Sequence, residues 1–258
     1  MSLSGETTET MSTAESLTQI LRVQQIAEDS GQGLAVYPQG RRNMTPLQLY
    51  TQSGESLSPQ DGMVGYYRFI AAGADRTQPS KSRLNITVKK AYLPEMAAAL
   101  AKLTMRNISV ISQSKVTAYD HVGKVAESAV VYLNTQSEAQ ARVIKDKFLS
   151  EFSQRLQGRG VTALDALADH PSVSLMELEK GIHYKEISEK AAQSGKGSFA
   201  NAVSGIVTEA IMYGRQTPSV SPKKALRHVL KAWGYSRTNP ALVRRSPAPG
   251  WVRGRETF

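Results

Sequence analysis

The stretch Arg83-Leu84-Asn85-Ile86-Thr87-Val88 alternates between polar and apolar side chains, which predicts a β-strand with two different faces. Its leucine, isoleucine and valine would point toward a core, and its arginine, asparagine and threonine would form a polar row on the other face. A second segment, Lys115-Val116-Thr117-Ala118-Tyr119-Asp120, follows after a helical stretch. If both segments lie in one sheet, the leading lysine joins the polar row. We therefore expect a compact positive site on rigid elements.

Apolar spacing on both sides of this stretch predicts a partial alternation of strands and helices. Strands are expected over residues 64–70, 83–89, 108–116, 128–133 and 182–187, and helices over 93–105, 137–157, 199–211 and 221–233. The predicted fold class is α+β, with a central mixed or antiparallel sheet packed with helices.

The first 62 residues differ in character from the rest of the chain. A capping box formed by Ser12 and Glu15 predicts a helix to about Asp29, and turn residues dominate the passage that follows, with one short helix expected at 47–51. We therefore predict an N-terminal extension over residues 1–62 and an α+β core over residues 63–258 that ends in a basic tail.

Composition excludes several classes of protein and site. Hydrophobic residues make up 40% of the 258 residues and charged residues 21%, as in ordinary globular proteins. Cysteine is absent, which rules out disulfides and the common zinc sites, and the four histidines show no metal-ligand spacing. No apolar run approaches the roughly 20 residues that cross a bilayer. No cofactor is expected.

The net charge of +10 is spread unevenly along the chain. Residues 1–60 hold three basic and six acidic side chains, whereas residues 223–258 hold nine lysines or arginines and one glutamate. A basic protein suggests an anionic partner, which could be a phosphorylated peptide, a nucleic acid or a membrane surface. Charge alone does not choose among these partners.

Lys115 is the strongest single candidate for chemistry. A lysine abstracts a proton only when it is neutral, so its pKa, ordinarily near 10.4, must be lowered by burial or by positive neighbours such as Arg68, Arg83, Lys89 and Lys90. The same cluster would hold a phosphate dianion through charge-assisted hydrogen bonds. The alternative is a set of ordinary solvated charges on an exposed sheet face.

Two further basic segments have both a functional and a structural interpretation. Lys196, in a Gly-Lys-Gly sequence just before a helix, could contact an anion, or the segment could be a linker in which Ser198 caps the helix. The C-terminal arginines could track a nucleic acid together with Trp233, Tyr235 and Trp251. We favour instead a strap whose aromatic side chains lie in the core while its arginines stay solvated.

Several segments in a fixed order resemble the HrmA or HopA family of type III secretion effectors from plant-pathogenic bacteria. They are R-L-N-I-T-V at 83–88, P-E-M-A-A-A-L-A-K-L at 94–103, S-K-V-T-A-Y-D-H-V at 114–122, A-V-V-Y-L at 129–133, G-S-F-A-N-A-V at 197–203 and G-Y-S-R-T-N-P-A-L at 234–242. The resemblance covers roughly residues 60–250. It implies secretion into the cytoplasm of host plant cells, virulence, a hypersensitive response and host protein partners, phosphorylated ones included. It also implies a secretion chaperone if the native N-terminal region is present.

The same core is distantly similar to phosphothreonine lyases of the OspF and SpvC type, which implies a lyase-like fold. Their catalytic lysine begins a K-V-T-D segment that Lys115-Val116-Thr117 matches, and their general-acid histidine lies in an F-H-I-S-V strand matched by Leu84–Val88. Asn85 therefore stands at the acid position, where it cannot donate a proton, and losing a general acid removes roughly 10²- to 10⁴-fold in rate. The resemblance assigns phosphate binding to Arg83 and, more loosely, to Lys196.

Three hypotheses follow from these residues. The first is an effector whose cationic, lyase-like cleft binds a phosphorylated or acidic host ligand. The second is an active phosphothreonine or phosphoserine lyase that uses His121 or His183 as its acid. The third is a nucleic-acid-binding protein that uses the basic tail, and it is the least favoured. Whether the chain is an enzyme stays open at this point.

Overall fold

The computed structural model describes residues 34–39, 66–74, 80–117, 127–169, 175–193 and 199–245, and the chain divides into two compact units after Lys185. The predicted helix from Ser12 to about Asp29, the short helix at 47–51 and the domain boundary at residue 62 lie outside the described residues. Within those residues, the helices are too short or too polar to span a bilayer.

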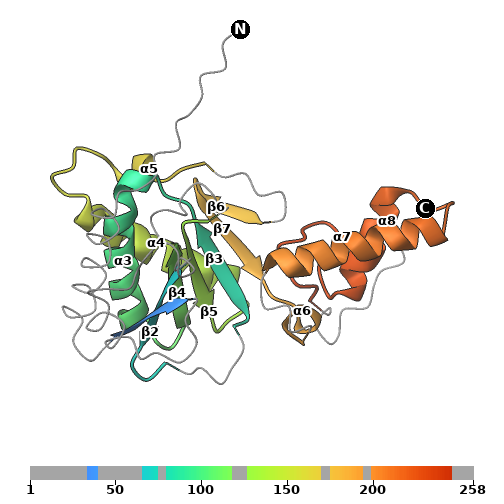
Figure 1. Ribbon diagram of the computed structural model, residues 1–258, viewed down its shortest axis with the longest axis horizontal. Helices are drawn as coiled ribbons and strands as arrows, with labels where there is room; N and C mark the ends of the chain where they lie inside the picture. The colour runs from blue at the N-terminus through green and yellow to red at the C-terminus, as the bar shows by residue number, and fades with distance from the viewer. Residues whose placement is uncertain are drawn as a thin grey trace, which may run out of the picture. The chain divides into compact units, whose positions relative to one another are not determined.

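A seven-stranded sheet forms the centre of the N-terminal unit (Figure 1), with strand order β1-β2-β4-β5-β3-β7-β6. The strands in chain order are β1 (Leu34–Gln39), β2 (Tyr66–Ala71), β3 (Ser82–Ile86), β4 (Ile111–Thr117), β5 (Ala129–Leu133), β6 (Met176–Glu179) and β7 (Ile182–Glu186). Neighbours pair antiparallel from β1 to β2, β2 to β4, β4 to β5, β5 to β3 and β7 to β6. The fold class is therefore α+β with an antiparallel sheet, as predicted.

Two long helices pack against one face of this sheet (Figure 1). Helix α3 (Leu93–Arg106) follows a short 3₁₀ helix, η2 (Lys90–Tyr92), and α4 (Glu138–Arg155) begins after Ser137, whose side chain accepts a hydrogen bond from the Gln140 amide. Apolar residues at helical spacing on both helices are buried with Leu84 and Ile86 of β3. This packing forms the core that the alternation of β3 predicts.

The sequence-based prediction missed two strands, β1 and β6. Both lie at the edges of the sheet, where strands are short and where a proline such as Pro38 of β1 is tolerated. Turn residues surround β1 in the sequence, and β6 has only four residues, so neither gives a clear alternating pattern. The strand expected at 182–187 is present as β7.

Gly181, in the turn between β6 and β7, connects β7 to β3. Its backbone φ is +67°, and its carbonyl accepts a hydrogen bond of 2.8 Å from the Thr87 amide. A Cβ atom at this position would lie 2.7 Å from the Ala168 carbonyl oxygen and 3.0 Å from the Thr87 carbonyl oxygen. Only glycine therefore fits this turn without moving the backbone.

Gly181→Ala is expected to lower the free energy of unfolding by about 3 kcal/mol, because left-handed strain adds to a clash with backbone atoms. Gly160→Ala is the matched control, since Gly160 has a φ of +66° and open space around it. The control should lose only about 1–2 kcal/mol. Urea unfolding followed by circular dichroism measures both variants, and equal losses would contradict the close contact at Gly181.

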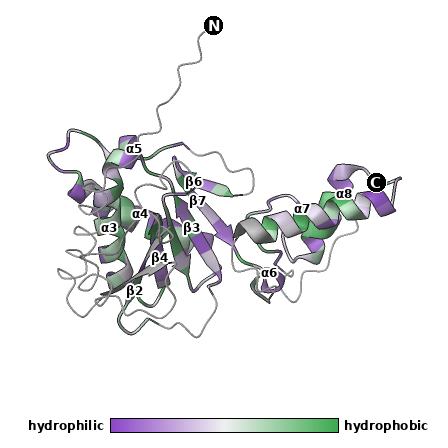
Figure 2. Ribbon diagram, in the orientation of Figure 1, coloured by the Kyte–Doolittle hydropathy of each residue, from purple (hydrophilic) through white to green (hydrophobic). Residues whose placement is uncertain are grey.

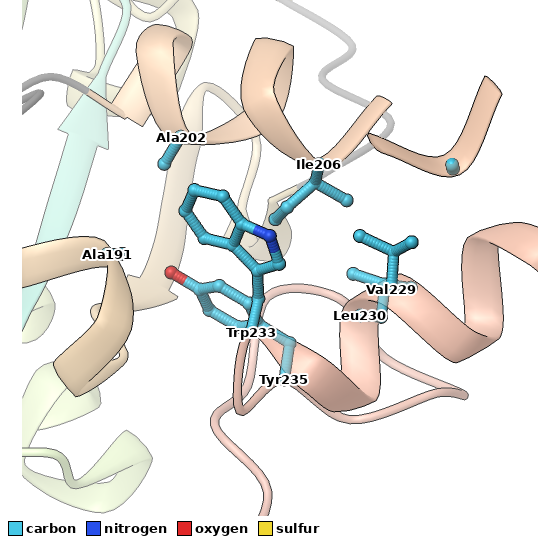
Figure 3. Packing of buried hydrophobic residues seen from close by; sticks show 8 residues of the cluster. Ala191, Ala202, Ile206, Val229, Leu230, Trp233 and Tyr235 are labelled. Carbon is cyan, nitrogen blue, oxygen red and sulfur yellow. The ribbon is translucent and has the colours of Figure 1, made fainter. Parts of the chain in front are cut away.

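The C-terminal unit contains the helices α6 (Glu189–Gln193), α7 (Phe199–Gln216) and α8 (Pro222–Ala232), with α5 (Ala163–Ala166) belonging to the N-terminal unit. Its core includes Trp233 and Tyr235, which are 3% and 1% exposed (Figure 3). The Trp233 Nε1 donates a hydrogen bond of 2.8 Å to Glu209, and the Tyr235 hydroxyl accepts one from the Ser188 amide. These two aromatic side chains lie in the core, as the strap interpretation predicts, whereas Trp251 lies outside the described residues.

Candidate anion-binding site on the sheet

The face of the sheet turned away from α3 carries the charged residues of the site. Thr104 of α3 and Ser114 of β4 share a hydrogen bond with 2.6 Å between their hydroxyl oxygens, so Ser114 points toward the helix. Successive side chains of a strand point to opposite faces. Lys115 of β4 therefore points to the face opposite α3.

Strand register places a row of residues across this face. Arg68 of β2 pairs with Lys115, Lys115 pairs with Val130 of β5, and Val130 pairs with Asn85 of β3. Since neighbouring strands are about 4.8 Å apart, Lys115 and Asn85 flank Val130 at roughly 10 Å between their Cα atoms. The lysine and the asparagine thus lie in one line, with one apolar residue between them.

A second row lies two residues further along the same strands. Arg83 of β3 pairs with Tyr132 of β5, and Tyr132 also pairs with Gln113 of β4. Arg83 is only 5% exposed, and its charge acts on both Lys115 and Tyr132. The structure thus brings Arg68, Arg83 and Lys115 together on the face that also carries Asn85.

Lys185 of β7 adds a fourth cation to this cluster. Its side chain is 3% exposed, and the charge of Arg83 acts on it across the boundary between β3 and β7. Alternation along β7 puts His183, which is also buried, on the same face as Lys185. We refer to Arg68, Arg83, Asn85, Lys115, Tyr132 and Lys185 as the sheet site.

Burial and mutual repulsion change the protonation equilibria of this site. Burial lowers the pKa of Lys115, Glu127 at 3.8 Å raises it, and Arg83 and Arg68 lower it again, with a net decrease. Burial, together with the charge of Arg83, lowers the pKa of Lys185 to about 7. Burial raises the pKa of the Tyr132 phenol. Both lysines thus have a larger neutral fraction near pH 7 than an exposed lysine has.

Asn85 is buried in the site with an unused acceptor. Its side chain is 6% exposed, and among the described residues its Oδ1 atom accepts no hydrogen bond. Buried polar atoms normally have a partner, and a bound ligand is one way to provide it. An amide here can bind a ligand through hydrogen bonds, but it cannot supply a proton.

The other predicted phosphate-binding residues have different places. Lys89 is exposed beside η2. The hydrogen bond from the Thr162 hydroxyl lowers the pKa of Asp165, and the charge of Lys89 lowers it to a smaller extent. Lys89 does not join Arg83 and Lys115. Lys196 and His121 lie outside the described residues. No group of three metal-ligating side chains occurs in the described part of the chain.

Three residues of this region were not singled out from the sequence: Lys185, Tyr132 and Glu127. Lys185 lies in a segment that was expected to be a strand, so alternation with Ile182 and Tyr184 would have placed it opposite the core. Tyr132 lies in an almost wholly apolar strand, and its pairing with Arg83 depends on strand order. No local pattern reveals such a pairing.

Four cations gathered in a poorly solvated region suit one class of ligand. Arginine offers a planar fork for phosphate oxygens, and the two lysines supply further donors. Even when Lys185 is neutral, the charges of Arg68, Arg83 and Lys115 outweigh the one negative charge of Glu127. The arrangement therefore favours a compact anion with several acceptor oxygens, such as a phosphate group.

The model of the HopA1 effector protein family matches residues 61–242. Protein HrmA of Pseudomonas syringae pv. syringae is 25% identical over 187 residues, which are 72% of this chain and 45% of HrmA. The chain thus spans about half the length of this curated relative.

Solved structures of two effector proteins show the same fold. The effector protein from P. syringae pv. syringae strain 61 matches with a TM-score of 0.69 and 22% identity, over 91% of this chain and 84% of that one. The effector protein from P. syringae pv. tomato strain DC3000 gives a TM-score of 0.68 and 23% identity with the same coverage. The type III effector and phosphothreonine lyase OspF from Shigella flexneri matches far more weakly, with a TM-score of 0.36 and 14% identity over 69% of this chain and 95% of OspF.

Proposed function

This chain belongs to the HopA1 effector protein family, and on that premise we propose that it is a virulence effector delivered by type III secretion into the cytoplasm of host plant cells. There it acts on host proteins and triggers the hypersensitive response. A secretion chaperone binds it where the native N-terminal region is present. The sheet site is the place where it meets its host ligand.

We propose further that the sheet site binds a phosphorylated segment of a host protein. The observation that carries this proposal is the convergence of Arg68, Arg83, Lys115 and Lys185 on one sheet face. Burial disfavours the charged forms of these cations, which Glu127 offsets only in part, and a bound anion would favour the charged forms again. The unused Asn85 Oδ1 can accept a hydrogen bond from a peptide N–H of such a segment, and the Tyr132 phenol can donate one to a phosphate oxygen.

Lys115→Met is expected to weaken the binding of a phosphothreonine peptide by about 10- to 100-fold, since a hydrogen bond to a charged group contributes about 1.5–3 kcal/mol. Isothermal titration calorimetry with the phosphorylated peptide and its unphosphorylated form measures this effect. The fold should persist, because a partly exposed ion pair such as Lys115–Glu127 contributes at most about 1 kcal/mol.

Lys102→Met is the matched control. Lys102 of α3 is also partly exposed and pairs with Glu151 at 2.6 Å, but it lies on a helix that packs on the opposite face of the sheet. The control should bind the phosphopeptide as the wild type does. Equal binding by the Lys115 variant, or equal affinity for the unphosphorylated peptide, would refute phosphate recognition at this site.

The geometry also supports a second candidate function, β-elimination of phosphate from phosphothreonine or phosphoserine. Neutral Lys115 would take the α-proton, the electron pair would form the Cα–Cβ double bond, and the Cβ–O bond would break as phosphate leaves. His183, which alternation puts on the site face, would protonate that phosphate. Mass spectrometry separates the two functions, because only the lyase removes the mass of phosphoric acid from the peptide, and Lys115→Met would abolish this loss.

A further inference from the structure

Helix α8 of the C-terminal unit presents a line of positive side chains. Lys223, Arg227 and Lys231 are spaced four residues apart, and Lys224 lies beside them, all of them exposed, whereas the ring of the neighbouring His228 stacks on Tyr213 of α7. Figure 2 shows hydrophilic and hydrophobic residues alternating along α7 and α8. Since four residues of helix rise about 6 Å, the line is roughly 12 Å long. We call Lys223, Lys224, Arg227 and Lys231 the basic stripe.

The lysines and arginine of the stripe form no hydrogen bond or ion pair within the described part of the chain. Two carboxylates of the C-terminal unit are already engaged elsewhere. Glu186 accepts hydrogen bonds from the Val243 amide and from Arg245, and Glu209 contacts Trp233 and Lys190. The described residues of this unit include nine lysines or arginines and three glutamates, so its positive charge is not offset internally.

The stripe is unfavourable for the helix that carries it. Like charges four residues apart destabilise a helix, and Lys223 and Lys224 oppose the positive end of the helix dipole in a first turn that has no acidic residue. The side chain of Ser221 at the N-cap makes no hydrogen bond that would compensate. A local arrangement that weakens its own helix points to a role outside folding.

We propose that the basic stripe docks an acidic helix of a partner protein. Glutamates four residues apart on such a helix repeat at the same spacing as Lys223, Arg227 and Lys231. Leu226, which is 38% exposed and three residues from Lys223, supplies an apolar contact at the edge of the stripe. On α8 itself Leu226 is the only large apolar side chain that is exposed, because Val229 and Leu230 are buried within the unit, so this helix offers little apolar area for insertion into a membrane.

The test uses the full chain and a designed helical peptide with glutamates four residues apart next to leucines. A second peptide with glutamine in place of glutamate, a DNA duplex and vesicles of phosphatidylserine and phosphatidylcholine are the comparison probes. The variant carries Lys223→Glu, Arg227→Glu and Lys231→Glu. Its charge-matched control reverses three exposed cations of α4 in the N-terminal unit, Arg142, Lys147 and Arg155.

We expect the acidic peptide to bind the wild type and the control alike, and the stripe variant at least about tenfold more weakly. The melting temperature of the stripe variant should stay level or rise, since its new charges suit the helix dipole. Unchanged binding by the variant, equal binding of the glutamine peptide, tighter binding of DNA or vesicles, or a lower melting temperature would each overturn the proposal. Lys115→Met should leave this binding intact, which separates it from the sheet site.

Discussion

Lys185→Met is expected to remove a large part of the dependence of stability on pH between about pH 7 and 10. The pKa of Lys185 falls from 10.5 to about 7 in the folded protein. Between these values the unfolded chain binds more protons than the folded one, so the free energy of unfolding of the wild type rises with pH. The rise amounts to on the order of 4 kcal/mol.

Methionine cannot titrate, so the stability advantage of the Lys185 variant should be largest near pH 7 and below, and should shrink as the pH approaches 10. Urea unfolding at several pH values measures the difference in free energy of unfolding between the variant and the wild type. The titration of Tyr132 and Lys115 largely cancels in this difference, because both proteins contain these residues. Lys180→Met is the control, since Lys180 lies in the exposed turn before β7. A difference that stays constant with pH would show that Lys185 remains charged in the folded protein.

Trp233→Ala is expected to destabilise the C-terminal unit by about 3–5 kcal/mol, the range found when a large buried aromatic side chain is deleted. The indole packs in the apolar cluster, donates a hydrogen bond to Glu209, and lies 4.8 Å from the Lys190 ammonium, measured to its ring centre. It also lies against Gly205 of α7, where a Cβ atom would come within 3.2 Å of the ring. Circular dichroism during urea unfolding reports the loss without relying on tryptophan fluorescence.

Trp233→Phe separates the contributions of packing and hydrogen bonding at this position. Phenylalanine keeps most of the apolar contact but cannot donate to Glu209, so this variant should lose considerably less stability than the alanine variant. If Trp233→Ala and Trp233→Phe lost the same free energy of unfolding, packing of the indole in the apolar cluster would not be its main contribution to stability. A loss below about 1 kcal/mol in Trp233→Ala would contradict this packing contribution as well.

The strands and helices whose apolar residues recur at a regular spacing were predictable, because that spacing can be read from the local sequence alone. The alternation at 83–88 predicted a strand with one apolar and one polar face, and apolar residues at helical spacing predicted α3 and α4 within a few residues. The edge strands β1 and β6 were missed, since an edge strand carries less of the core pattern. The helices α7 and α8 of the C-terminal unit were predicted from their caps and apolar stripes, whereas the five-residue helix α6 was not predicted.

The site was predictable only in part, because it depends on strand order. Arg83 and Asn85 could be assigned to one face from their own strand. Lys115 lies near them only because a single strand, β5, separates β4 from β3, and Lys185 lies near them only because β7 follows β3 in the sheet. Such long-range order comes from packing the whole sheet. The exposed position of Lys89, two residues after Thr87, likewise depends on where β3 ends.

The burial of Lys185 beside Arg83 has a consequence for the way in which the sheet site would take up a ligand. With a pKa of about 7, this side chain is neutral in a large fraction of molecules at the pH of a cell. A phosphate dianion that enters the site favours the ammonium form, so anion and proton would bind together. The acidity of the surrounding compartment would then set how tightly the effector holds its target.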